Sequence, residues 1–173
     1  IVSGDSSGTV TYSPHGSQIV SGDDRGNVTT WEAGSLAKVH TASIGYFSVK
    51  SVAYSPDGRE IATGDWAKQL TLWERATGAK VRELECGGWV NSVAWSPDAV
   101  MIASGSYDHT IKTWWRASTS VIASFFLQQT LTGHSGGVTS VALSSDNKLG
   151  AAASAELPEY ALKIFRRAAA ASW

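Results

Sequence analysis

The residue types that could do chemistry are few in this chain and lie far apart in the sequence. Four histidines, His15, His40, His109 and His134, and a single cysteine, Cys86, are the candidate metal ligands and nucleophiles. A zinc site needs paired Cys or His ligands at short spacing, and a cysteine nucleophile needs a nearby histidine base. Neither pattern occurs, so we expect no metal, no cofactor and no catalytic residue, and the protein is predicted not to be an enzyme.

The glycines and carboxylates predict turns rather than catalysis. The sequence has no Gly-x-Ser-x-Gly elbow, no phosphate-binding loop and no dinucleotide fingerprint. Asp57 and Asp98 each follow a Ser-Pro pair, where local hydrogen bonding in a turn is a sufficient explanation for the carboxylate. The 8 tryptophans and 17 glycines instead suggest many short strands, tight turns and a recurring large aromatic residue.

An internal sequence repeat determines the structural units in which these residues lie. A shift of 42 residues places Trp31 on Trp73, and a further 41 residues places Trp73 on Trp114. The last copy is looser, with Phe165 lying 51 residues beyond Trp114, so residues are added near 118–129 and near Leu157. Each copy is therefore one structural unit.

Within each copy, short apolar runs alternate with polar turns. In the second copy these runs are Val49–Tyr54, Ile61–Gly64, Leu70–Trp73 and Lys80–Leu84. Four short antiparallel strands in a period of about 42 residues make one blade of a β-propeller. The fold is predicted to be all-β, with about four blades of four strands. Their predicted bounds are 12–48 with an incomplete start, 49–89, 90–137 with the insertion near 118–129, and 138–173 with an Ala-rich tail; residues 1–11 are a leftover hairpin of a preceding blade.

The repeat motifs resemble those of the WD-repeat β-propellers over nearly the whole chain. The shared features are the Ser-Pro-Asp/His-Gly turns, the Ile-Ala/Val-Ser/Thr-Gly strands, the Trp that ends the third strand and one Gly-His pair, Gly133-His134. The resemblance implies a fold that carries binding surfaces for many different partners. Because that family more often uses about seven blades, the chain forms either a small closed ring or an open arc completed by missing sequence, other domains or another chain.

The resemblance also implies a hydrogen-bond relay in each blade, from Trp through Ser or Thr and His to Asp. Ser104, Asp108 and Trp114 match three of these positions, but the preceding segment, 86–89, supplies no His. His134 is present in the last copy, where Phe165 replaces the Trp. No blade has a complete relay, so each is predicted to be less stable by about 1 kcal/mol for every missing partner.

A candidate partner-binding face is predicted where the turns between second and third strands meet the connections between blades. Large aromatic residues in such turns are not needed by the core and are typical anchors of protein interfaces. For Tyr46 and Phe47 the alternative is that they fold back onto the rim. The tryptophans at repeat positions, such as Trp73 and Trp114, are predicted to be core residues. The candidate partner-binding residues are Arg25, Tyr46, Phe47, Asp65, Trp66, Trp89 and Tyr107.

Two stretches leave alternatives open. Residues 1–11 match residues 19–29 at eight of eleven positions with a shift of only 18, so Thr11-Tyr12 is either a genuine deletion or a junction where residues are missing from the sequence. The Ala-rich stretches 151–153 and 168–171 are either placeholders for other residues or a small-residue strand and a helical tail.

Composition and charge narrow the class of function. A net charge of -1 lacks the basic footprint of a nucleic-acid binder, and the most apolar stretch, 121–127, is too short to span a bilayer. A single cysteine cannot form an internal disulfide, which favours an intracellular, cytoplasmic location. The predicted function is a non-catalytic scaffold that binds other protein subunits of a multi-protein complex. The alternative is a ligand reader that recognises a modified peptide or a glycan on its aromatic face.

Overall fold

The computed structural model describes residues 8–117, 124–154 and 161–166, and these residues form strands and turns without a helix. No helix in the described part of the chain is long and apolar enough to cross a membrane. The strands are β1 (Thr9–Tyr12), β2 (Gln18–Gly22), β3 (Asn27–Glu32), β4 (Lys38–Ser43), β5 (Val49–Tyr54), β6 (Glu60–Asp65), β7 (Gln69–Glu74), β8 (Lys80–Glu85), β9 (Val90–Trp95), β10 (Met101–Ser106), β11 (Ile111–Arg116), β12 (Phe125–Leu131), β13 (Val138–Leu143), β14 (Leu149–Ser154) and β15 (Ala161–Arg166).

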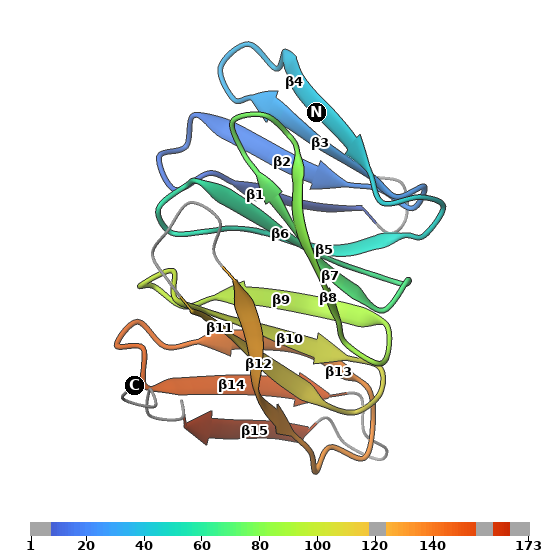
Figure 1. The fold of residues 1–173 in the computed structure, drawn as a ribbon, viewed down its shortest axis with the longest axis vertical. Coiled ribbons are helices and arrows are strands. Elements are labelled where there is room, and N and C mark those ends of the chain that lie inside the picture. The colour runs from blue at the N-terminus through green and yellow to red at the C-terminus, as the bar shows by residue number, and fades with distance from the viewer. Residues whose placement is uncertain (1–7, 118–123, 155–160, 167–173) are drawn as a thin grey trace.

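The strands form four antiparallel sheets, each made of strands consecutive in sequence. Blade 1 is β1–β4, blade 2 is β5–β8, blade 3 is β9–β12, and blade 4 is β13–β15 in the described residues. The blades follow one another from the top of Figure 1 to the bottom, so the first and last sheets lie at opposite ends of the molecule. The prediction of an all-β propeller fold is confirmed, and the blades form an open arc.

The turn that joins the first two strands of blade 2 shows why the repeat sequence folds this way. Gly58 has a φ of 69°, a left-handed conformation that favours glycine, and its amide donates to the Ser55 carbonyl at 2.8 Å. The Asp57 carboxylate accepts hydrogen bonds from the Ser55 hydroxyl and the Arg59 amide. The Ser-Pro-Asp-Gly motif is therefore a closed hydrogen-bonded turn, as its sequence predicts.

The first strand of each blade lies at the inner edge of its sheet. β1 contacts β5, β5 contacts β9, and β9 contacts β13. Hydroxyl groups link these inner strands, because the Val93 amide donates to Ser51 Oγ and the Val141 amide donates to Ser92 Oγ, each at 3.1 Å. The outer strands β4 and β8 carry mostly exposed side chains.

The hydrophobic core lies between blades rather than within any one of them. Leu70 and Leu72 on β7 share a buried cluster with Val90 and Val93 on β9 of the next blade. A glycine on the second strand makes room for this packing, since a Cβ on Gly64 would lie 2.5 Å from Val90 Cγ1. Each blade therefore depends on its neighbour for burial of its apolar face.

Polar side chains also link neighbouring blades. Arg75 of blade 2 donates to the Gln18 side chain of blade 1 at 3.0 Å, and Arg116 of blade 3 forms an ion pair with Glu60 of blade 2. Both arginines follow or end the third strand of their blade. Arginine side chains at the same repeat position thus link blade 2 to blade 1 and blade 3 to blade 2.

Two predicted boundaries fall inside strands. β1 crosses the boundary predicted after Thr11 and pairs with β2, with Thr9 opposite Gly22 and Tyr12 opposite Ile19, while residues 1–7 lie outside the described residues. Residues 125–129 of the predicted insertion form part of β12, because their backbone pairs with β11. Residues 151–153 lie in β14, and residues 118–123, Leu157 and 168–171 lie outside the described residues.

Candidate functional site

In blades 2 and 3, backbone hydrogen bonds hold the turn between the second and third strands against the connection that precedes the blade. The Trp66 amide, at the β6–β7 turn, donates to the Ser48 carbonyl at 3.1 Å, and the Tyr107 amide, at the β10–β11 turn, donates to the Trp89 carbonyl at 2.8 Å. The two kinds of loop therefore share one face, and the backbone at these aromatic positions is fixed.

Three of the predicted partner-binding residues stack on one another across two blades. The ring centroids of Trp66 and Trp89 are 5.1 Å apart with an interplanar angle of 29°, and those of Trp89 and Tyr107 are 5.0 Å apart at 33°. We call Trp66, Trp89 and Tyr107 the aromatic ladder. Its side chains remain 40%, 40% and 58% exposed, so the ladder is a continuous aromatic surface that blade packing does not cover.

Glycines beside the ladder allow the loops to approach closely. A Cβ on Gly88 would lie 2.7 Å from Ser106 Oγ, and a Cβ on Gly137 would lie 3.1 Å from Tyr107 Cδ2. Both distances are too short for a side chain to fit without a shift of its neighbours. The Gly-Gly pair before Trp89 therefore lets the β8–β9 connection sit directly on the β10–β11 turn.

A lysine that the sequence did not single out caps one end of the ladder. Lys50 Nζ lies 4.1 Å from the centroid of the Trp66 ring, within the range of a cation–π contact. Lys50 is the second residue of β5, one of the inner strands. The Trp66 face is thus occupied by a cation from the same chain, and the other rings stack instead of enclosing a space.

The remaining predicted aromatics lie beside the turn of blade 1. Tyr46 is 99% exposed and Phe47 is half-exposed, so neither folds back onto the rim. Arg25 is exposed, and its amide donates to the Asp23 carboxylate, which caps the β2–β3 turn. Arg25 and Tyr46 belong to an open pocket lined by Asp24, Arg25, Asn27, Ser43, Gly45 and Tyr46.

Asp65 is the one predicted partner-binding residue that the structure removes from the exposed face. Its side chain is buried, and its carboxylate accepts a hydrogen bond from the Gln69 amide at 2.9 Å. Burial raises the pKa of this carboxyl, although hydrogen bonds from the Gln69 and Ala67 amides oppose the shift. Asp65 caps the β6–β7 turn as Asp23 caps the β2–β3 turn, so it supports the ladder from below instead of facing a partner.

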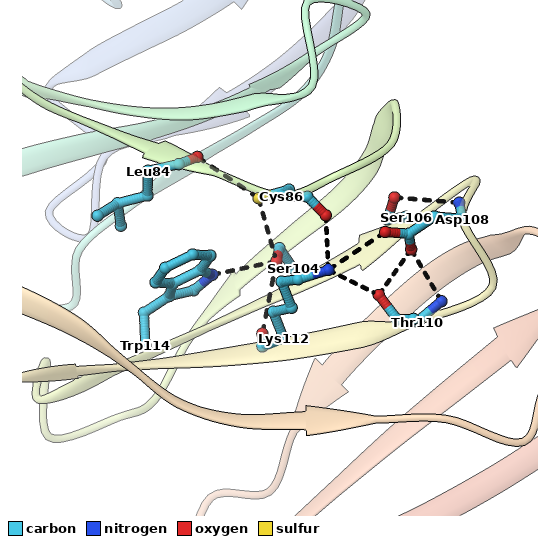
Figure 2. Close-up of polar contacts among 8 residues, drawn as sticks. All are labelled: Leu84, Cys86, Ser104, Ser106, Asp108, Thr110, Lys112 and Trp114. Atoms are coloured by element: carbon cyan, nitrogen blue, oxygen red, sulfur yellow. Dashed lines mark hydrogen bonds and ion pairs between the residues drawn. The ribbon is translucent and has the colours of Figure 1, made fainter.

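The relay of blade 3 keeps its tryptophan end. Trp114 Nε1 donates to Ser104 Oγ at 3.1 Å, and the Cys86 thiol, at the position of the absent His, lies 3.6 Å from the same hydroxyl (Figure 2). Equivalent bonds join Trp31 to Ser21 and Trp73 to Thr63, each at 3.0 Å. The Trp-to-hydroxyl bond is therefore present in blades 1 to 3 without a histidine.

Lys112 connects the cysteine to the aspartate in blade 3. Its Nζ donates to the Cys86 carbonyl at 2.6 Å and lies 3.2 Å from Asp108 Oδ2 (Figure 2). Desolvation by burial raises the pKa of Asp108, but hydrogen bonds from Thr110 and Lys112 outweigh it, and the pKa lies below its ordinary value. A lysine thus replaces the histidine as the group that joins the turn to the preceding connection.

The Cys86 thiol is a structural group. It is fully buried, and burial raises its pKa to about 11. A thiolate is the reactive form of cysteine, so this environment disfavours nucleophilic chemistry. Among the described residues, no three His, Cys, Asp or Glu side chains are grouped so that they could hold a metal ion.

His134 of blade 4 bonds to a different hydroxyl from the one that the relay pattern implies. His134 Nδ1 lies 2.7 Å from Ser154 Oγ. The strand register, however, pairs Val141 with Ala152 as it pairs Val93 with Ser104, so Ala152 occupies the relay position and Ser154 lies two residues further along β14. Phe165 has no ring N–H to donate, and Ala152, at the position of the hydroxyl acceptor, is correspondingly apolar.

Comparisons with known proteins identify the family. The sequence profile of the WD domain, G-beta repeat, matches residues 37–74, 78–114 and 125–156. The chain belongs to the WD40 repeat family. No curated protein matches the chain.

Solved structures with this WD40 architecture are about twice as long as the chain. A crystal structure of a mitotic checkpoint complex contains a chain that is 30% identical, with a TM-score of 0.78, covering 92% of this chain and 48% of that one. The structure of U3-55K is 23% identical, with a TM-score of 0.77, covering 91% and 50%. Kuenenia stuttgartiensis hydrazine synthase is 16% identical, with a TM-score of 0.79, covering 91% and 45%, and at that identity shows the fold alone.

The sequence pattern located the WD40 loops but not every group in them. It brought Trp66, Trp89 and Tyr107 to one face, whereas it missed Lys50, because a lysine at the start of a strand carries no signal. The bridging role of Lys112 was also missed. A cation on β11, four residues after an aspartate in the preceding turn, could have suggested it, because the two side chains are close in sequence and opposite in charge.

Proposed function

We propose that this chain is a non-catalytic WD40 scaffold that binds other protein subunits through the aromatic ladder. The observation that carries the proposal is the stacking of Trp66, Trp89 and Tyr107 into one exposed surface at centroid distances of 5.0 to 5.1 Å. Clustered Trp and Tyr side chains supply much of the binding energy of protein interfaces.

The rigidity of the ladder favours tight binding. The backbone amides of Trp66 and Tyr107 are already hydrogen-bonded to the neighbouring loops, and each ring is held by the next. Ordering of loops and side chains on association costs about 0.5–1.5 kcal/mol for each immobilised side chain. A partner that binds a preformed ladder avoids most of this cost.

The similar structures support a role in assemblies. One of them is described as a mitotic checkpoint complex, so a chain of this fold occurs there within a complex. The near-neutral charge of this chain favours protein over nucleic-acid partners, and its single buried cysteine fits a reducing, intracellular compartment. The buried Cys86 thiol, with its raised pKa, is a poor nucleophile.

The test is affinity purification of the tagged chain from cells of its source, with partners quantified by mass spectrometry. A W66A/W89A/Y107A variant should lose the partners that bind the wild-type chain. The matched control is V81A/F126A/L127A, which removes exposed apolar side chains from the outer strands β8 and β12. Equal partner recovery by the ladder variant and the wild-type chain, with circular dichroism unchanged, would refute the proposal.

A ligand reader is the second candidate, and the open pocket beside Arg25 and Tyr46 is the observation that favours it. Arg25 and Asp24 could bind charged groups of a modified peptide or a glycan, with Tyr46 stacking on an apolar part. Binding of short modified peptides or glycans by the isolated chain, abolished by Arg25→Ala and retained by the ladder variant, would favour this function over the scaffold.

A further inference from the structure

The aromatic ladder exposes ring edges more than ring faces. Lys50 Nζ lies 4.1 Å from the centroid of the Trp66 ring, and Trp89 stacks on the same ring at a centroid distance of 5.1 Å. Such a stack leaves no room for an ammonium group between the two rings, so Lys50 and Trp89 lie against opposite faces of Trp66. Both faces of Trp66 are therefore occupied by groups of the chain itself.

The other two rings have neighbours of the same kind. Trp89, in the connection between blades 2 and 3, stacks on Trp66 of blade 2 and on Tyr107 of blade 3. Beyond Tyr107 lies the backbone of Gly137, where an added Cβ would be 3.1 Å from the Tyr107 Cδ2 atom. The stack thus runs from Lys50 to Gly137, and a partner that approaches the exposed part of it meets ring edges.

The exposed edges of the ladder carry hydrogen-bond donors and positive partial charge. An aromatic ring has a negative face and a positive edge. The indole N–H groups of Trp66 and Trp89 have no acceptor within the part of the chain that the structure describes. By contrast, the tryptophans on the third strands of blades 2 and 3 donate to hydroxyls of their own blades. The ladder therefore offers two indole donors to a partner.

Two lysines beside the ladder add full positive charges. Lys50 contacts the ladder but forms no ion pair within the described residues. Lys68 is exposed in the β6–β7 turn and also lacks a carboxylate partner among these residues. The aspartates of the two turns do not balance these charges, because Asp65 is buried and Asp108 pairs with Lys112.

We propose that the ladder binds an acidic segment of its partner protein, in which Asp or Glu side chains pair with Lys50 and oxygen atoms accept from the indole N–H groups. This inference rests on the proposed scaffold function and names the chemistry of the partner. Cationic ligands and stacked bases need free ring faces, so the same geometry disfavours both. The ladder lies on blades 2 and 3, each of which has a described blade on both sides.

Selection from a random dodecapeptide phage-display library tests the charge preference. The 173-residue chain and its W66A/W89A/Y107A variant serve as parallel targets, and the peptides that bind only the wild-type chain are sequenced. We expect these ladder-dependent peptides to be enriched in Asp and Glu and depleted in Lys and Arg relative to the unselected library. Neutral or basic peptides would overturn the proposal, and so would the absence of any ladder-dependent peptide.

Affinity measurements with the most enriched peptide test the role of Lys50. Replacement of the peptide's Asp and Glu by Asn and Gln should weaken binding about tenfold, and Lys50→Met should weaken binding of the acidic peptide by a similar factor. Because Met keeps an aliphatic side chain beside Trp66, this variant should bind the amide peptide as the wild-type chain does. Lys148→Met, which removes an exposed lysine from the β13–β14 turn, is the matched control and should change neither affinity. Equal binding of the acidic peptide by Lys50→Met and the wild-type chain would overturn the proposal.

Affinity purification from cells separates a failure of this inference from a failure of the scaffold function. Partners that the ladder variant loses and Lys50→Met retains in full would leave the scaffold function in place and overturn the acidic segment. Partners that the ladder variant retains would refute both. Partners lost by the ladder variant and reduced about tenfold by Lys50→Met, but not by Lys148→Met, are the result that we expect.

Discussion

Blades 3 and 4 keep opposite parts of one hydrogen-bond relay. Blade 3 retains the tryptophan end, with Trp114 bonded to Ser104, and has Cys86 in place of the histidine. Blade 4 retains the histidine, bonded to Ser154, and has Phe165 and Ala152 where blade 3 has Trp114 and Ser104. Both blades nevertheless form antiparallel sheets, of four strands in blade 3 and of three described strands in blade 4.

The difference shows that the relay consists of two separable pairs. A buried Trp N–H needs an acceptor, so the tryptophan and its hydroxyl partner are retained together in blades 1 to 3 and lost together in blade 4. The histidine position varies independently of that pair, since the connection before blade 2, residues 44–48, contains no histidine and the Trp73 bond is retained. Four predictions break or sharpen this comparison.

The largest expected difference lies in the aromatic residues themselves. Trp114 is buried beside Ser104 and Ile102, so Trp114→Ala should lower the free energy of unfolding by about 3–5 kcal/mol. Phe165 is only partly buried, and Phe165→Ala should cost roughly half as much. Urea denaturation at one fixed protein concentration measures both. Equal losses would contradict the view that blade 3 holds the more stabilising half.

The next effect isolates the hydroxyl of the tryptophan pair. Ser104→Ala leaves the buried Trp114 N–H without its acceptor and should cost about 1–3 kcal/mol. Thr113→Val is the matched control. The Thr113 hydroxyl on β11 is also buried but accepts no hydrogen bond from a tryptophan, so its replacement should change the free energy of unfolding little. Chemical denaturation compares the two variants, and a larger loss for Thr113→Val would contradict the pairing.

The sequence predicted the blades well because the repeat dictates strands, turns and inter-blade packing at once. Ser-Pro-Asp-Gly forms a turn, Gly64 allows close packing of the next blade, and Trp73 packs in the core, as their repeat positions indicate. The relay was harder to predict, because the hydroxyl that reaches His134 depends on strand register, and the register places Ala152 at the relay position while His134 bonds to Ser154. The prediction that Asp65 faces a partner was wrong for a related reason. An acidic residue beside a turn is expected to be exposed, whereas the Asp65 carboxylate is buried and accepts hydrogen bonds from backbone amides of the turn.

A smaller effect is expected when the tryptophan pair is installed in blade 4. Ala152→Ser alone places a hydroxyl at a buried position and should destabilise the chain, because Phe165 offers it no donor. Phe165→Trp supplies the donor, so the double variant should recover about 1 kcal/mol relative to the sum of the single variants. A double-mutant cycle measured by denaturation gives this coupling energy. A coupling near zero would show that the β14–β15 geometry, unlike that of β10–β11, does not support the bond.

The smallest expected effect is a dependence of stability on pH, which comes from Asp108 in the relay of blade 3. The pKa of Asp108 in the folded chain lies below its ordinary value of 3.8, because hydrogen bonds from Thr110 and Lys112 outweigh the opposing effect of burial. The folded state therefore binds fewer protons than the unfolded state in this range. The stability that Asp108 contributes is complete above its ordinary pKa and is lost as the pH falls through the lowered one.

Thermal unfolding measured across the acid range should thus show a smaller fall in stability with decreasing pH for Asp108→Asn than for the wild-type chain. Asp24→Asn, which removes an exposed charge from the turn of blade 1, controls for net charge and should keep the wild-type slope. If Asp108→Asn also kept that slope, Lys112 would hold the β10–β11 turn through the Cys86 carbonyl alone, and the lysine would replace the histidine without using the aspartate at all.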